Sequence, residues 1–228
     1  NMEVASFRKK ELISNYVILG IFAIVSLAPI LVLIFNAFKP AVEFGTNPIG
    51  LPNNITFQNF PDAWIQGEYS KIFFNSFKLV LGTLILCISV SSLAGFSLAK
   101  LNPKGSNLVA IYLLVGISIP AQMFLLPLFL LWKNLGLLNT HIGLIIIYSA
   151  LNAPFATFLI RSYMIRLPDE LFDAAKIDGA NILQQFFRVA IPLSWPVLLT
   201  SALVVGLAVW NEFLFALTFV QDEELKPI

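Results

Sequence analysis

The sequence has few charged residues, and this scarcity limits the kinds of protein that it can encode. Only 12% of the 228 residues are charged, whereas a soluble domain carries about 25%. Because 58% of the residues are hydrophobic, a single core cannot hide so much apolar surface from water, so the solvent must be partly lipid. The net charge of +1 excludes an acidic tail and a broad basic surface for nucleic acid.

Cysteine and histidine each occur once. The lone Cys87 excludes an intrachain disulfide and a cysteine metal cluster. The lone His141 argues in the same way against a histidine-based metal site. The sequence has no G-x-S-x-G elbow and no paired carboxylates within an apolar run, which disfavours a membrane-embedded enzyme.

Five apolar runs are long enough to cross a bilayer, which needs roughly 20 such residues. They cover residues 16–38, about 73–99, the interval between Lys104 and Lys133, about 142–160 and about 196–220. The first run exceeds the apolar stretch of a cleaved signal peptide, so we expect an uncleaved helix. The runs predict an all-α, polytopic membrane protein with a single transmembrane domain over residues 1–228.

The distribution of Lys and Arg predicts the topology. Three connecting segments carry three, two and four positive charges, nine in all. These charges are Arg8, Lys9 and Lys10, then Lys100 and Lys104, then Arg161, Arg166, Lys176 and Arg188. The opposing segments carry four or five. We therefore expect a cytoplasmic N-terminus, an extracellular loop at 39–72 and a cytoplasmic loop at 161–195.

The cytoplasmic loop begins with the pattern of a short helix. Pro168 suits the first helical turn, where the missing N–H costs nothing. Asp169 and Glu170 follow it at the positive end of the helix dipole. The helix is expected to run to about Asp178, and Gly179 suits the left-handed position that ends it.

A second short helix is predicted directly after the glycine. Asn181 can cap it, with Gln184 as the partner in a capping box. This helix, residues 182–190, should stop before Pro192. Two interpretations stay open on physical grounds: a pair of amphipathic helices that rests on the membrane surface, or a plug that fits a cleft in a cytoplasmic partner.

The same loop carries a recognisable motif. Asp173-Ala-Ala-x-x-Asp-Gly-Ala, eleven residues and then Pro192-Leu-x-x-Pro196 resemble the EAA signature of bacterial binding-protein-dependent ABC importer permeases. The wider sequence is similar to the smaller permeases of the maltose-type carbohydrate subgroup. The matching segments are Ile55–Trp64, Asn75-Ser76, Ile119-Pro120, Leu126-Pro127, Leu135–Thr140 and Trp210–Phe213.

The sequence departs from the family in two places. Asp173 stands where the family has Glu, so any ion pair that it makes must be re-spaced. Family members also have a sixth span, and we expect one to follow the five present here. The resemblance implies the transmembrane fold of a type I ABC importer.

The resemblance also implies a transport subunit of the bacterial inner membrane that is not itself an enzyme. Its partners would be a sister permease, identical or different, two ATPase subunits and an extracellular solute-binding protein, with no nucleic acid. The chain would bind no cofactor, because ATP and Mg²⁺ belong to the ATPase. The sequence agrees, since it contains no G-x-x-x-x-G-K-S/T phosphate loop.

In the family, the EAA loop forms a coupling helix that docks in a groove of the ATPase. Carried onto this sequence, the resemblance assigns docking to eight residues of the cytoplasmic loop. They are Leu171, Phe172, Asp173, Ala174, Ala175, Asp178, Gly179 and Ala180.

Ionisable residues inside spans are functional candidates by default, and Glu212 is the clearest. It can either hold two helices together by a hydrogen bond or form a polar wall for a sugar, whose hydroxyls suit carboxylates and amides. The candidate substrate path comprises Gln122, Asn152, Trp210, Asn211 and Glu212.

The favoured function is ATP-driven import of a sugar or oligosaccharide. The alternatives are a subunit of an ion-coupled secondary carrier, an ABC permease for a non-sugar solute, and a non-transporting receptor or scaffold. Ion-coupled carriers often show repeated halves, and no convincing repeat is visible in this sequence.

Overall fold

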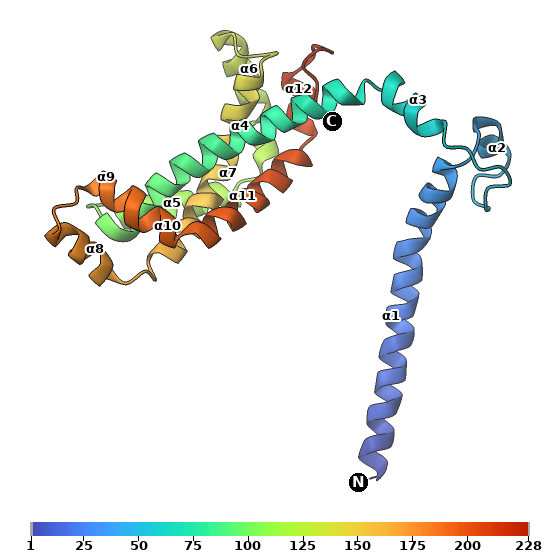
Figure 1. The fold of residues 1–228 in the computed structure, drawn as a ribbon, viewed down its shortest axis with the longest axis horizontal. Helices are drawn as coiled ribbons and strands as arrows, with labels where there is room; N and C mark the ends of the chain where they lie inside the picture. The colour runs from blue at the N-terminus through green and yellow to red at the C-terminus, as the bar shows by residue number, and fades with distance from the viewer. Residues whose placement is uncertain (1, 228) are drawn as a thin grey trace. The chain divides into compact units, whose positions relative to one another are not determined.

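The computed structural model describes residues 2–227, and for residues 2–11, 13 and 14 it describes the backbone alone. The chain divides into two compact units, Asn1–Tyr69 and Ser70–Ile228. The described residues form helices and connecting segments without a strand (Figure 1), which confirms the all-α prediction. Within residues 2–227, three helices are long and apolar enough to cross a membrane, or up to five if each of two bent pairs counts as one span.

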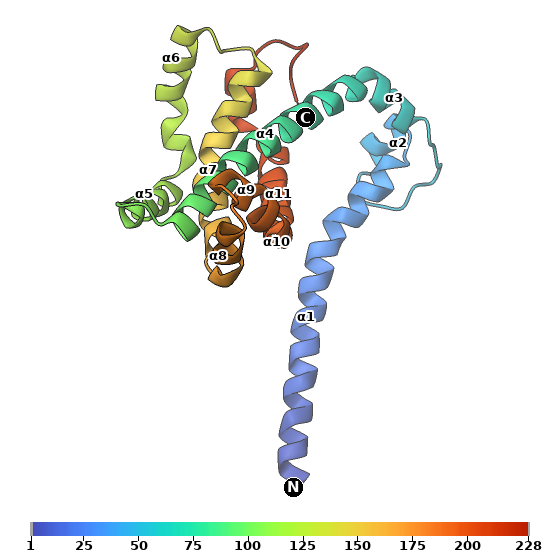
Figure 2. The same cartoon turned by 60° about the vertical axis from the view of Figure 1, so that its left-hand side comes forward.

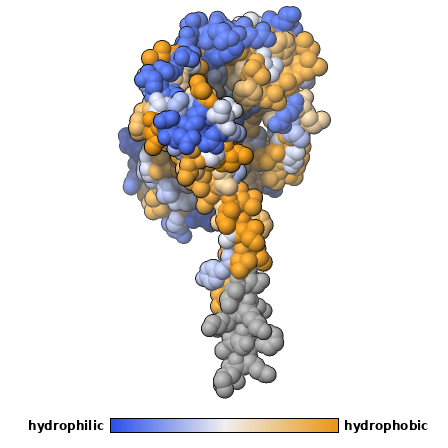
Figure 3. All heavy atoms as spheres, turned by 90° about the vertical axis from the view of Figure 1, so that its right-hand side faces the viewer, coloured by the Kyte–Doolittle hydropathy of each residue, from blue (hydrophilic) through white to orange (hydrophobic). Residues whose placement is uncertain are grey.

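The first unit consists of one long helix and a folded loop. Helix α1 (Met2–Ala37) contains the first candidate span, Asn15–Ala37, with a mean hydropathy of 3.0. The described part of this helix is apolar on all sides and exposed within the unit, and Figure 3 shows mostly apolar side chains along it. A helix that is apolar all round is stable where lipid or another protein surrounds it, so the expected first span is confirmed.

The loop after α1 folds onto itself and contains two short helices, α2 (Ala41–Thr46) and α3 (Asn59–Gln66). Lys39 is fully buried, and its Nζ donates to Asn36 Oδ1 at 2.8 Å and to the Asn47 carbonyl at 2.6 Å. Asn59 donates to the carbonyls of Ala37 and Lys39 at 2.9 and 2.7 Å. The bond to Ala37 satisfies a carbonyl group at the end of α1. Together the four bonds give the loop a defined conformation.

A carboxylate caps a second turn of the same loop. Glu43 accepts hydrogen bonds from the backbone N–H groups of Asn53, at 2.6 Å, and Asn54, at 3.1 Å. These bonds, that from Asn53 first, lower the pKa of the Glu43 carboxyl below its ordinary value, because they favour the charged form. The turn at Asn53 and Asn54 is therefore held by a side chain ten residues away.

The second unit contains the remaining apolar runs. Helix α4 (Tyr69–Phe96) continues into the π-helix η1 (Ser97–Leu101), and α7 (His141–Met164) forms the other straight span. Helix α4 starts four residues before the predicted beginning at Phe73. Helix α7 runs past Ile160 to Met164.

The third apolar run is not one straight helix. It forms α5 (Ser106–Ser118), the short 3₁₀ turn η2 (Ala121–Phe124) and α6 (Leu125–Leu135), with a bend of 92°. The bend lies at Ile119, which is extended because it precedes Pro120. The single span expected between Lys104 and Lys133 is thus a bent pair.

The fifth apolar run is interrupted as well. Helix α11 (Trp195–Trp210) ends before residues 211–213, and α12 (Leu214–Phe219) follows. Two apolar cores hold the second unit together. One includes Leu144, Ile147, Val205, Phe215 and Phe219, and the other includes Phe96, Ile160, Met164, Phe172 and Phe186.

Candidate functional site

The predicted pair of short helices is present and lies at one end of the second unit (Figures 1 and 2). Helix α8 (Asp169–Ile177) follows Pro168 and carries two carboxylates in its first turn. Asp178 ends the helix, and Gly179 has φ +81°, the left-handed conformation expected from the sequence. The Ala180 N–H then donates to the Ala175 carbonyl at 2.9 Å, which closes the helix end.

The second helix starts as predicted but ends later. In α9 (Ile182–Gln185), Asn181 Oδ1 accepts from the Gln184 N–H at 2.9 Å, and Gln184 Oε1 accepts from the Asn181 N–H at 2.8 Å. This is the expected capping box. The chain then continues through the π-helix η3 (Phe186–Ala190) into α10 (Ile191–Leu193).

The prediction that this helix stops before Pro192 is wrong. The widened turn of η3 changes the hydrogen-bonding register, and Pro192 falls in the first turn of α10. A proline is tolerated there, because a first-turn N–H has no partner within its helix. The segment α8–Gly179–α9 is called the elbow below.

Helix α8 is joined to the spans by a group of side chains and one carbonyl, which we call the α8 junction. Its members are Phe96, Lys100, Leu167, Asp169, Phe172 and Phe186. Phe172 is only 3% exposed, and its ring lies 6.1 Å from that of Phe96, which in turn lies 5.4 Å from that of Phe186. Helix α8 is therefore packed against the end of α4 and against η3.

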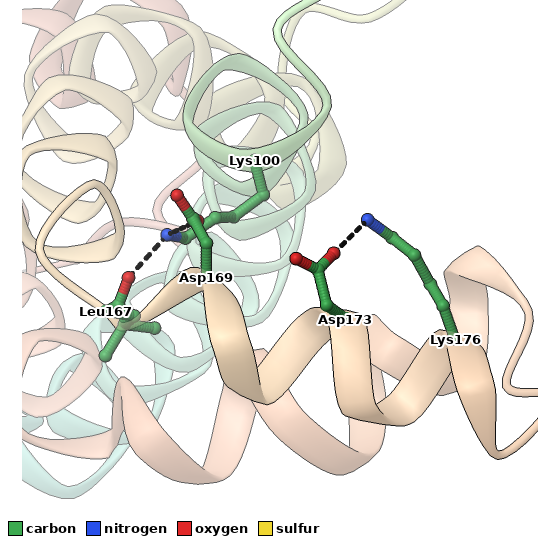
Figure 4. Close-up of polar contacts among 5 residues, drawn as sticks. All are labelled: Lys100, Leu167, Asp169, Asp173 and Lys176. Atoms are coloured by element: carbon green, nitrogen blue, oxygen red, sulfur yellow. Dashed lines mark hydrogen bonds and ion pairs between the residues drawn. The ribbon is translucent and has the colours of Figure 1, made fainter.

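Lys100 supplies the polar contacts of the α8 junction (Figure 4). Its Nζ donates to the Leu167 carbonyl and to Asp169 Oδ1, both at 2.6 Å, and lies 5.1 Å from the centre of the Phe172 ring. The lysine side chain is 6% exposed and that of Asp169 is 81% exposed. The hydrogen bond and charge of Lys100 lower the pKa of the Asp169 carboxyl below its ordinary value.

Most of the residues assigned to docking lie on the surface of the elbow. Leu171, Asp173, Ala174, Asp178 and Gly179 are exposed, and Ala175 and Ala180 are half-buried. Asp173 forms an exposed ion pair with Lys176 at 2.9 Å, one turn along the helix (Figure 4).

Phe172 requires a correction. It was predicted to dock with a partner, but its ring is enclosed by its own chain in the α8 junction. Successive residues of an α-helix point about 100° apart, so Phe172 anchors the helix while its neighbours stay exposed.

Four apolar side chains outside the assigned docking set are exposed on and beside the elbow. Ile177 is 87% exposed, and Ile182, Leu183 and Phe187 are also exposed. An open groove of about 550 Å³ lies along residues 180–183, Lys176 and Gln185. The available signal was apolar residues in a charged loop that is predicted to be cytoplasmic, which marks a protein or membrane contact.

Glu212 lies in the break between α11 and α12 and has several partners. The Tyr148 hydroxyl donates to Glu212 Oε2 at 2.8 Å, and the N–H groups of Phe215 and Ala216 donate to the same carboxylate at 3.0 to 3.3 Å. The carboxylate thus caps α12 and ties it to α7, as the first of the two interpretations expected. The adjoining cavity has a volume of about 10 Å³, which is enough for one water molecule.

The structure does not gather the five predicted path residues into one site. Trp210 and Glu212 line the small cavity, and Trp210 meets Phe73 edge-on at 5.7 Å. Asn152 donates to the Tyr148 carbonyl at 2.8 Å, and Asn211 donates to the carbonyl of Leu207, one turn earlier in α11, at 2.7 Å.

Gln122 lies in a different and larger groove. The groove measures about 530 Å³ and lies between α7 and the bend that joins α5 to α6. Its lining is mostly apolar and includes Tyr112, Phe124, Pro154 and Phe155 beside Gln122. Its volume is typical of a small-molecule site.

At the other end of the second unit, three side chains hold residues 221–226, and we call this arrangement the loop anchor. Asn75 donates to the carbonyls of Glu224 and Lys226 at 3.0 and 3.2 Å. Asn139 Oδ1 accepts from the N–H groups of Gln221 and Asp222, and His141 Nε2 lies 3.0 Å from the Leu225 carbonyl. Asn75 and Asn139 fall within segments that carried the family resemblance, and the structure gives them a positional role.

The chain is similar to known membrane transport proteins. Residues 88–226 match the family described as "Binding-protein-dependent transport system inner membrane component". The chain is 35% identical over 215 residues to the probable ABC transporter permease protein YurM of Bacillus subtilis, covering 94% of this chain and 71% of that protein. It is 31% identical over 210 residues to the diacetylchitobiose uptake system permease protein NgcG of Streptomyces coelicolor, covering 92% and 70%.

A solved structure shares the fold. It is a bacterial ABC transporter involved in the import of the acidic polysaccharide alginate. The similarity has a TM-score of 0.85 at 25% identity and covers 96% of this chain and 77% of that one.

Proposed function

Because this chain belongs to the binding-protein-dependent transport system inner membrane components, which are transport subunits rather than enzymes, we propose that it moves a sugar or oligosaccharide across the bacterial inner membrane. NgcG and the alginate importer resemble this chain over more than nine-tenths of its length, and both are named for the uptake of a carbohydrate. The proposed cycle is driven by ATP, which is hydrolysed with Mg²⁺ in a separate ATPase.

The elbow is the observation that carries this proposal. It presents Leu171, Ile177, Ile182 and Leu183 to solvent while Phe172 fixes α8 to the spans. An exposed apolar face on a rigid support suits close docking with another protein. We assign docking of the ATPase to this face, with Asp173, Ala174, Ala175, Asp178, Gly179 and Ala180 as its remaining members.

The proposed assembly contains a sister permease, two ATPase subunits and an extracellular solute-binding protein. The excess of Lys and Arg on the segments around the elbow supports a cytoplasmic position for that end and for the N-terminus. Loop 39–72 then faces outward.

The proposed solute path uses the groove at Gln122 together with Asn152, Trp210, Asn211 and Glu212. Aromatic faces and an amide, the groups that line this groove, suit the apolar faces and hydroxyls of a sugar. The partners of Glu212 do not favour the ion-coupled alternative, because its carboxylate already accepts several internal hydrogen bonds.

The test of docking uses two glycines in the same conformation. Gly179 and Gly136 each follow a helix with positive φ, and a Cβ added at either would meet nothing within 4 Å. Both Val substitutions therefore cost similar backbone strain. Only Gly179→Val adds bulk to the elbow.

In reconstituted complexes with the ATPase and the solute-binding protein, Gly179→Val is expected to reduce solute-stimulated ATP hydrolysis about tenfold. Gly136→Val is expected to keep it. Unchanged stimulation in Gly179→Val, or an equal loss in both variants, would defeat the assignment of docking to the elbow.

A further inference from the structure

We infer that Lys100 is a positioning residue for coupling, which fixes α8 to the end of α4 so that a displacement of the elbow moves the spans with it. This inference rests on the proposed function. It follows from the geometry of the α8 junction, where residues far apart in the sequence meet at the start of α8 (Figure 4).

The contacts of Lys100 are directional, and its side chain is only 6% exposed. Two of its three ammonium protons are taken by the Leu167 carbonyl and Asp169, at the same short distance of 2.6 Å. The acceptors flank Pro168, the N-cap residue of α8. Lys100 therefore determines where the first turn of α8 lies relative to η1.

The position is electrostatically unfavourable for a lysine without these acceptors. A cation at the N-terminus of a helix opposes the helix dipole, and a buried ammonium is costly unless it is paired. Asp169 and the Leu167 carbonyl offset both costs, and the face of the Phe172 ring adds a favourable contact at 5.1 Å. The position of the Lys100 ammonium is favourable only while the start of α8 supplies these acceptors.

Apolar packing alone would leave the position of α8 less well defined. The Phe96, Phe172 and Phe186 rings join α4, α8 and η3, but hydrophobic contacts are non-directional and allow rings to slide. Hydrogen bonds lose strength steeply with angle. The hydrogen bonds of Lys100 thus fix the position of α8 along the end of α4, which the apolar contacts alone would leave variable.

The attachment extends from α4 to α7. Helix α4 passes so close to α7 at Gly95 that a Cβ added there would lie 3.1 Å from Ile160 Cγ2 and 3.2 Å from the backbone nitrogen of Arg161. Ile160 and Met164 of α7 also belong to the core that encloses Phe172. A force applied to α8 therefore reaches two spans, α4 through Lys100 and α7 through the shared core.

The decisive experiment compares Lys100→Met with Lys100→Arg and Lys104→Met in the complete reconstituted transporter. Lys104 is exposed and lies in the same connecting segment, so Lys104→Met removes the same charge without touching the α8 junction. The measured quantity is the number of solute molecules imported per ATP hydrolysed.

Lys100→Met is expected to lower this ratio about tenfold, because interrupted coupling paths change transmission by up to this order. Lys100→Arg can still donate to both acceptors and is expected to restore most of the ratio, and Lys104→Met should leave it unchanged. An unchanged ratio in Lys100→Met, or an equal loss in Lys104→Met, would overturn the inference. If the wild-type complex imports nothing with ATP, the proposed function itself fails.

If Lys100→Met does not insert into the membrane, a second variant tests whether the Lys100 contact supports coupling. Asp169 is mostly exposed, so Asp169→Asn should fold, and it removes the charge that pairs with Lys100. The ratio is expected to fall about threefold in this variant, and no fall would contradict the inference.

Spin labels provide a direct structural readout. Cys87 is fully buried, so cysteines placed by Leu101→Cys and Glu170→Cys can be labelled selectively. The distance between the labels should stay the same with and without ATP when Lys100 is present, and its distribution should broaden in Lys100→Met. Equal distributions in both backgrounds would show that the lysine does not fix α8.

Discussion

The α8 junction and the loop anchor lie at opposite ends of the second unit and are built from different chemistry (Figures 1 and 2). At the α8 junction, three aromatic rings and a buried lysine join α4, α8 and η3. At the loop anchor, neutral amides and an imidazole contact backbone groups of residues 221–226. The difference teaches which end is more rigid, since large buried rings are costly to separate, whereas the exposed amide of Asn139 can exchange a backbone group for water.

The rigid end should respond most strongly to the loss of a ring. Phe172→Ala removes a fully enclosed side chain from the α8 junction, which is expected to lower the free energy of unfolding by about 3 kcal/mol. Denaturation of the purified protein in detergent measures the change. The exposed Phe187 provides the control, because Phe187→Ala removes the same atoms from the surface. Equal losses in the two variants would mean that the ring cluster does not hold α8.

The loop anchor should respond locally rather than globally. Asn139 has φ +55°, so Asn139→Gly fits the backbone and removes only the acceptor of the Gln221 and Asp222 N–H groups. Hydrogen exchange at residues 221–227 is expected to become faster, while the free energy of unfolding falls by about 1 kcal/mol or less.

Asn102→Gly is the matched control for the loop anchor. Asn102 also has positive φ, +41°, and its side chain accepts from Ser106 near the start of α5. Exchange at residues 221–227 should be unaffected by this change. If both variants speed exchange there, the protection does not come from Asn139.

Sequence reasoning predicted the elbow well because its determinants are local. Pro168, Gly179 and the Asn181–Gln184 pair each act within one helical turn, so their spacing alone fixes where the helices begin and end. The later end of the second helix was missed because a π-helix depends on tertiary packing and leaves no comparable signature.

The tertiary contacts of both ends were beyond sequence reasoning. Lys100 and Asp169 are 69 residues apart, and nothing in their local sequences pairs them. The direction in which Phe172 points depends on the position of Phe96 at the end of another helix. Glu212 was correctly singled out as a charge within an apolar run, but its role as a cap required the break at residues 211–213.

The smallest expected effect is the contribution of the Lys100–Asp169 ion pair to stability, which depends on pH. Lys100 lowers the pKa of the Asp169 carboxyl below its ordinary value near 3.8, so the contribution of this pair to stability is fully present above that value. It is lost as the pH falls through the lowered value, when the carboxyl becomes protonated in the folded protein. We expect the free energy of unfolding of the wild-type protein to fall slightly more steeply between about pH 5 and about pH 3 than that of Asp169→Asn. Identical profiles would mean that Lys100 is held at the α8 junction by the Leu167 carbonyl and the Phe172 ring without help from the carboxylate, which would leave the rigid end dependent on burial alone.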